Sequence, residues 1–167
     1  MLMEDRMLFG EINEFAIEVG RKKQPKKFRL RFWIEGQPMG VFVKAGDLAT
    51  SVRTFEAIRR QKDFMYLPLF EGLSLAEIHA YTIIDHSRAE ELDRLEQLVP
   101  LYKLSFFGIQ FTHTTSEYLL LYKEGRLHFL WKNRASEPLR TATIAFSVFC
   151  AVFEAYSDYC KQQGLLS

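Results

Sequence analysis

The clearest pattern along the chain is an alternation of apolar and polar residues between positions 28 and 43. One set of alternate positions is apolar and the other is mostly basic: Phe28, Leu30, Phe32 and Ile34 against Arg29, Arg31 and Trp33. Successive side chains of a strand point to opposite faces, so this period of two predicts a strand with one buried face. A turn-forming segment, Glu35-Gly36-Gln37-Pro38, follows, and the alternation resumes at Met39, Val41 and Val43. The stretch therefore predicts a β-hairpin.

A shorter alternation precedes this hairpin. Residues 15–19, with the sequence FAIEV, predict a first strand that Gly20 ends. Residues 21–27 form a basic segment, and its like charges and Pro25 keep it out of the interior of a sheet. The N-terminal part thus predicts a three-stranded antiparallel meander in which the basic loop joins the first strand to the hairpin.

Helical periodicity replaces the alternation after Val43. Asp47 is a suitable N-cap, and the apolar residues that follow lie on one helical face: Leu48, Val52, Phe55 and Ile58. Ser74 and Glu77 form a capping-box pattern, which predicts a second helix to about residue 85. Ser87 is the expected cap of a third helix that ends at Pro100. Residues 47–99 are therefore predicted to be a helical middle segment.

The last third of the chain returns to strand patterns. Residues 103–112 are rich in aromatic and β-branched residues and predict a strand, in which Gly108 marks a bulge or a close approach. A second hairpin is predicted at residues 118–132 around Glu124-Gly125, and a final strand at 141–146. From Ser147 a wide apolar stripe predicts a C-terminal amphipathic helix. The predicted fold class is α+β: an antiparallel sheet of about six to seven strands built from two hairpin units, with the C-terminal helix packed on it.

Length and composition are those of a globular protein. A chain of 167 residues fits one domain, predicted to span residues 1–167 with residues 1–6 as a flexible leader. Cys150 and Cys160 lie ten positions apart in one predicted helix, about 15 Å along its axis, and are expected to be free thiols. No signal peptide and no membrane-spanning run is present. These features predict a soluble cytoplasmic protein.

No stretch of the sequence carries a recognisable catalytic, cofactor-binding or metal-binding pattern. The four histidines are His79, His86, His113 and His128, and they have neither nearby cysteines nor the spacing of a zinc motif. Asp85-His86-Ser87 is better explained as a helix end followed by a cap, because the members of a catalytic triad meet in space and not in sequence. We therefore expect no enzyme activity, no cofactor and no metal.

Charge is balanced overall but clustered locally. The net charge is +1, yet one stretch combines basic residues with an aromatic one: Lys22, Lys23, Lys26, Lys27, Arg29, Arg31 and Trp33. This mixture suits protein contacts and also nucleic-acid binding, which a near-neutral chain makes the weaker alternative. A competing acidic surface is predicted on the third helix at Glu90, Glu91, Asp93 and Glu96. Either patch is equally compatible with an ordinary solvated surface.

Four segments together resemble the Immunity protein 42 family. They are FGEINEFAIE (9–18), RFWIEGQPMG (31–40), GDLATSVR (46–53) and YKEGRLHFLWK (122–132). In order and spacing they span nearly the whole chain from Met7. Two parts depart from the resemblance: the middle from Phe64 to Pro100, and the basic loop at residues 21–27.

The resemblance implies a protein that binds and neutralises a cognate bacterial toxin, encoded nearby, by stoichiometric binding without catalysis. It assigns no binding residue, so the basic aromatic patch around Trp33 is the expected partner surface on chemical grounds and the acidic helix is its competitor. Whether a helix covers the strand face that carries Arg29, Arg31 and Trp33 decides between these two surfaces. If a helix covers it, Trp33 belongs to the core; if the face is exposed, Trp33 is a candidate interface residue. A nucleic-acid-binding module using residues 21–33 and an enzyme remain the alternatives, and the sequence does not indicate an oligomeric state.

Overall fold

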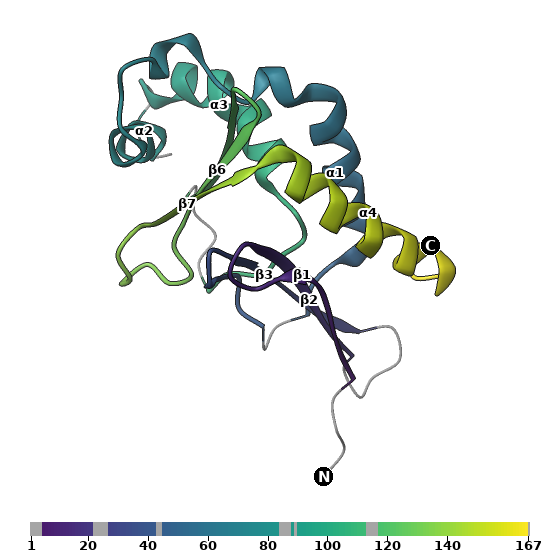
Figure 1. Cartoon of the computed structure of the whole chain (residues 1–167). Helices are drawn as coiled ribbons and strands as arrows, with labels where there is room; N and C mark the ends of the chain where they lie inside the picture. Colours follow the sequence, from purple (N-terminus) through teal and green to yellow (C-terminus); the bar gives the residue numbers. More distant parts are fainter. Residues whose placement is uncertain are drawn as a thin grey trace.

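A computed structural model describes residues 5–21, 27–42, 45–83, 88, 90–112 and 117–166 of the chain. Its secondary-structure elements in chain order are β1 (Arg6–Glu11), β2 (Phe15–Arg21), β3 (Phe28–Ile34), β4 (Gln37–Met39), α1 (Leu48–Gln61), η1 (Lys62–Phe64), η2 (Pro68–Phe70), α2 (Leu75–Thr82), α3 (Glu91–Ser105), β5 (Tyr118–Lys123), β6 (Arg126–Trp131), β7 (Arg140–Ala145) and α4 (Phe146–Gln162). The strands form two antiparallel sheets, and α4 packs on strands of both (Figure 1). The predicted α+β class is confirmed.

The hairpin predicted at residues 28–43 is formed by β3 and β4, but its second strand spans Gln37–Met39: Val41 is not in a strand, and Val43 lies outside the described residues. Its turn residues Glu35 and Gly36 have φ angles of 50° and 76°. Positive φ at both central positions gives a tight turn whose twist matches that of the strands. The predicted three-stranded meander has a fourth strand that the sequence pattern did not predict, because β1 pairs with β2. The four strands form a sheet in the order β1-β2-β3-β4, which we call the N-terminal sheet. β1 begins at Arg6, the last residue of the predicted leader, of which residues 1–4 lie outside the described part.

Strands β5, β6 and β7 form a separate second sheet. The predicted Glu124-Gly125 turn is confirmed, with φ angles of 51° and 75°. The seven strands are thus divided between sheets of four and three, and do not form the one sheet that the sequence predicted. Pro38 explains the division, because it has no N–H to offer a further strand beside β4. Its carbonyl accepts side-chain hydrogen bonds from Trp131 Nε1 at 3.0 Å and Asn133 Nδ2 at 2.8 Å, so side chains join the two sheets here.

Both predicted helix caps that the structure describes are confirmed. Asp47 Oδ1 accepts a hydrogen bond from Thr50 N at 3.1 Å, and Ser74 Oγ accepts one from Glu77 N at 3.2 Å. Helix α2 ends at Thr82, three residues before its predicted end. The predicted cap of the third helix, Ser87, lies outside the described residues.

Helix α3 and the segment after it differ from prediction. The third helix was expected to end at Pro100 and residues 103–112 to form a strand; both predictions are wrong, since α3 continues to Ser105 and residues 106–112 contain no strand. Buried leucines continue the helical spacing across the proline, namely Leu98, Leu101 and Leu104. Burial of each contributes about 1.5–3 kcal/mol, which together outweighs the cost of about 3 kcal/mol for a proline inside a helix. The close approach predicted at Gly108 is confirmed, because a Cβ there would lie 2.4 Å from the Asp47 carbonyl oxygen.

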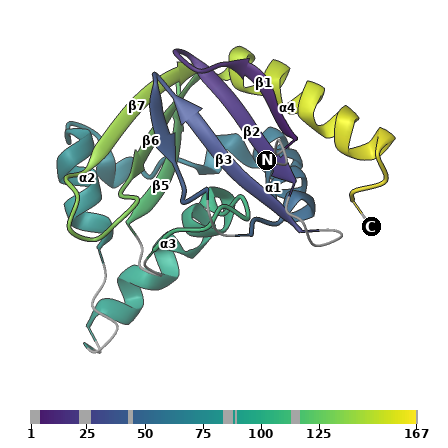
Figure 2. The same ribbon diagram turned by 90° about the horizontal axis from the view of Figure 1, so that it is seen from below.

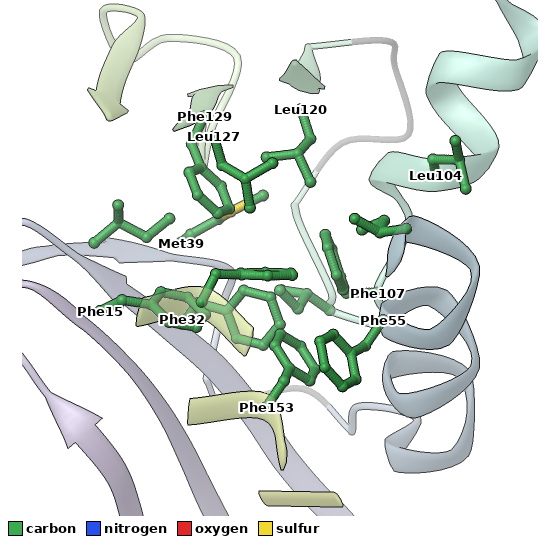
Figure 3. Packing of buried hydrophobic residues seen from close by; sticks show 14 of the residues in the cluster. Phe15, Phe32, Met39, Phe55, Leu104, Phe107, Leu120, Leu127, Phe129 and Phe153 are labelled. Carbon is green, nitrogen blue, oxygen red and sulfur yellow. The ribbon is translucent and has the colours of Figure 1, made fainter. Parts of the chain in front are cut away.

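The core is a cluster of aromatic rings between the N-terminal sheet and the helices (Figure 3). Phe15 and Phe32 of the sheet meet Phe153 of α4, whose ring stacks on Phe55 of α1 with centroids 4.8 Å apart. Phe107 enters the same cluster from the irregular segment after α3, 5.1 Å from Phe32. Residues far apart in the sequence therefore hold the inner face of the sheet against α1 and α4.

Helix α4 begins at Phe146, one residue before its predicted start. Its buried stripe comprises Phe149, Val152, Phe153, Tyr156 and Cys160. Cys150 and Cys160 are free thiols, as predicted. Neither α4 nor any other helix of the described residues is long and apolar enough to cross a membrane.

Candidate protein-interaction surface

The outer face of the N-terminal sheet, opposite the aromatic core, carries Arg29, Arg31 and Trp33. The strand alternation places them there because Leu30, Phe32 and Ile34 are buried on the inner face. Seen from this side, β1 to β3 lie in front of α1 and α4, and no helix of the described residues crosses the outer face (Figure 2). Trp33 is therefore outside the core.

Glu18 organises this face. Its side chain is only 10% exposed, and its Oε2 accepts hydrogen bonds from Arg31 Nε at 3.0 Å, Arg31 Nη2 at 2.6 Å and Trp33 Nε1 at 2.7 Å. The β2–β3 register places Glu18 directly opposite Arg31, and Arg6 Nη1 lies 3.5 Å from Glu18 Oε1. Charge-assisted bonds of this kind fix the geometry of both partners.

The Arg31 guanidinium is held between two aromatic rings. Its Cζ lies 4.5 Å from the ring centroid of Trp33 and 4.6 Å from that of Phe42. Phe42 can lie over the sheet because position 20 is glycine, where a Cβ would come within 2.9 Å of the Phe42 ring. Glu18, Arg31, Trp33 and Phe42, which we call the outer cluster, thus form a preorganised unit on an open sheet face.

A shallow hollow of about 240 Å³ lies beside the outer cluster. Its walls include Arg6, Met7, Leu8, Ile12, Arg31 and Trp33. Three of these are large apolar residues with substantial exposure: Met7 at 38%, Leu8 at 47% and Ile12 at 38%. An apolar hollow rimmed by arginine and tryptophan has the composition of a protein-interaction hot spot.

The structure places only part of the predicted basic patch. Lys22, Lys23 and Lys26 lie outside the described residues, whereas Lys27 is exposed and Arg29 is half-buried. Arg31 and Trp33 are brought together, but the residue that unites them, Glu18, was not predicted. Its signal was a carboxylate within the otherwise apolar run FAIEV, and only the strand register shows what faces it.

The competing acidic residues lie at the start of α3, away from the N-terminal sheet (Figure 1). Glu90, Asp93 and Glu96 are exposed, whereas Glu91 is half-buried and lies 3.3 Å from Arg94 Nη1. Leu92 is 53% exposed between them. This surface is a charged helix face that carries one exposed apolar residue.

The described part of the chain contains no cluster of titratable groups suited to a metal ion. No group of three or more histidine, cysteine, aspartate or glutamate residues there could hold a metal ion. Burial lowers the pKa of His79 and His128, and His128 Nδ1 lies 2.8 Å from Thr143 Oγ1. Asp85, His86, Ser87 and His113 lie outside the described residues.

Comparison with known proteins gives one result. A family model described as Immunity protein 42 matches residues 7–159, which is nearly the whole chain. No curated protein and no solved structure matches the chain.

Proposed function

The chain belongs to the Immunity protein 42 family, and from this premise we propose that it binds and neutralises a cognate toxin through the outer face of its N-terminal sheet. The family gives it an immunity role in a toxin system. The proposed mechanism is stoichiometric binding without catalysis, with the toxin encoded by a neighbouring gene.

One observation supports this surface above others: an open sheet face carries an arginine and a tryptophan that are already held in place. Arg31 and Trp33 share the Glu18 carboxylate, so binding would not have to order them. The adjoining exposed residues Leu8 and Ile12 supply apolar area. Hot spots are enriched in tryptophan and arginine and surrounded by contacts that exclude water.

The same geometry weakens the nucleic-acid alternative for the described part of the basic patch. The Arg31 side chain is only 20% exposed, and its guanidinium is engaged by Glu18 and lies between two rings. Phosphate neutralisation needs accessible cations.

The test is binding and rescue with the protein encoded by the adjacent toxin gene. Truncating a hot-spot residue commonly costs about 2 kcal/mol or more of binding free energy. Trp33→Ala should therefore raise the dissociation constant about 30-fold and abolish rescue of toxin-expressing cells. Ile12→Ser should also weaken binding. Phe64→Ser is the matched control, because Phe64 is 71% exposed and lies in η1, outside the N-terminal sheet.

Two results would count against the proposal. If Glu96→Lys on α3 weakens binding and Trp33→Ala does not, the toxin binds the acidic helix. If the unmodified protein neither binds the toxin nor protects cells from it, the immunity mechanism proposed here is wrong. Circular dichroism of each variant separates loss of contact from loss of fold.

A further inference from the structure

The outer edge of β1 presents main-chain groups that the N-terminal sheet does not use. Arg21 N donates to Asp5 O at 3.1 Å, and these two residues are opposite each other in the register that pairs Met7 with Val19. In an antiparallel pair of strands, hydrogen-bonded and non-hydrogen-bonded positions alternate along each strand. The main-chain groups of Met7 and Phe9 are therefore hydrogen-bonded to β2, whereas the N–H and C=O of Leu8 point away from it.

The two edges of this sheet differ in how they are protected. At β4, Pro38 removes the outward N–H and its carbonyl is bonded by Trp131 and Asn133. β1 has the sequence RMLFGE, with neither lysine nor proline, and its residues are exposed except for the half-buried Phe9. Such an edge is a template for a further strand.

Space for the side chains of an added strand exists on both sides of β1. The hollow of about 240 Å³ beside the outer cluster borders Leu8 on the outer face. A second hollow, of about 400 Å³, is lined by Met7 together with Tyr159 of α4 and Leu165, which follows that helix. An extended segment pairing with β1 could place alternate side chains in the two hollows.

A second copy of this chain is a poor occupant of the edge. Two β1 strands paired antiparallel about Leu8 would set Asp5 of each copy opposite Glu11 of the other, by the spacing of the sequence. Like charges directly opposite each other destabilise a strand pair. An extended segment with an apolar residue opposite Leu8 and a carboxylate beside Arg6, which is 54% exposed, meets no such repulsion.

We propose that the toxin binds by strand addition, with one of its extended segments pairing with β1 as a fifth strand of the N-terminal sheet. This inference rests on the proposed function and names the binding mode. β1 and β2 lie between the added strand and Trp33 of β3, and the hollow of about 240 Å³ that Leu8 and Trp33 both line connects the main-chain bonds at Leu8 with side-chain contacts at the outer cluster.

The test separates the Leu8 N–H from the Leu8 side chain. Leu8→Pro removes a donor that the N-terminal sheet does not use, and proline is tolerated at an edge position of this kind. Leu8→Thr is the matched control, because it shortens the side chain but keeps the N–H. With the adjacent-gene toxin as the probe, Leu8→Pro should bind at least about tenfold more weakly than Leu8→Thr.

Hydrogen exchange of the unmodified protein supplies an independent measurement that needs no variant. The Leu8 amide should exchange rapidly in the free protein and become protected in the complex, whereas the Met7 amide should be protected in both. Circular dichroism and thermal unfolding establish that Leu8→Pro folds.

Each outcome decides one question. Equal affinities of the two variants with an unprotected Leu8 amide overturn strand addition and leave the proposed function intact. A dimer of the free protein that Leu8→Pro converts to a monomer assigns the edge to a second copy, and overturns the inference as well. If the unmodified protein does not bind the toxin, the proposed function is wrong, and the strand-addition inference that rests on it is wrong as well.

Discussion

Replacing Glu18 with alanine removes the acceptor that Arg31 and Trp33 share. Oε2 of Glu18 accepts three hydrogen bonds, and two of them come from the guanidinium of Arg31, whose side chain is 20% exposed. After the substitution the Arg31 charge stays between the Trp33 and Phe42 rings without a carboxylate. A charge left without its partner in a mostly buried position is the costly part of the change.

The magnitude follows from burial. Breaking a fully buried ion pair by removing one partner costs about 3–5 kcal/mol. Arg31 is partly exposed, so water can still solvate its charge and reduce this cost. We therefore expect a loss of about 2–3 kcal/mol in the free energy of unfolding. For a chain of 167 residues, each kcal/mol shifts the unfolding midpoint by about 2–4 °C. Glu18→Ala should therefore lower the midpoint by roughly 4–12 °C.

The assay is thermal unfolding followed by circular dichroism, with a double-mutant cycle over Glu18→Ala and Arg31→Ala. Because removing both partners leaves no buried charge, the double variant should lose about 1–3 kcal/mol less than the sum of the single variants. Glu71→Ala is the matched control: Lys123 Nζ donates to both Glu71 oxygens at 2.8 and 2.9 Å, but Glu71 is 63% exposed. Equal midpoints for Glu18→Ala and Glu71→Ala would refute the reasoning from burial.

Three further predictions concern the helices and the histidines. Pro100→Ala restores a helix donor toward the Glu96 carbonyl and should raise the free energy of unfolding by about 1–2 kcal/mol; an unchanged or lower midpoint in thermal unfolding contradicts this. Burial raises the pKa of the Cys160 thiol to about 11, so a disulfide reagent at pH 8 should modify it only after unfolding, and rapid reaction of the native protein would show that it is accessible. Burial lowers the pKa of His79 and His128 below the ordinary 6.5, so the unfolded chain binds protons first and stability should fall as the pH drops below 6.5. Glutamine at both positions should flatten this dependence in denaturant titrations, and an unchanged slope would assign it to other groups.

Features encoded by short-range pattern were predicted correctly. The first hairpin follows from the alternation on either side of Glu35-Gly36, and the second from the two apolar runs that flank Glu124-Gly125. In both, glycine at the second turn position permits the positive φ that the turn requires. The caps at Asp47 and Ser74 follow from local hydrogen bonding. In each case the determining contacts lie within a few residues along the chain.

Features that depend on distant partners were missed. Composition made 103–112 look like a strand, but Phe107 and Ile109 are buried from an irregular segment. A pattern of apolar residues does not distinguish these two ways of filling a core. Likewise, Glu18 is paired with Arg31 only once the register across the basic loop is known, and that register is set by packing on α1 and α4. The candidate site was therefore half predicted: Arg31 and Trp33 from the sequence, and Glu18 and the β1 edge from the structure.

The aromatic core also fixes when during synthesis this surface can form. Phe15 and Phe32 of the N-terminal sheet pack against Phe149 and Phe153 of α4, more than 110 positions later in the sequence. The first strands leave the ribosome well before the helix that covers their inner face has been translated. A nascent chain without α4 thus has the residues of the outer cluster but no support beneath them, so the proposed binding surface would form only after α4 has been translated.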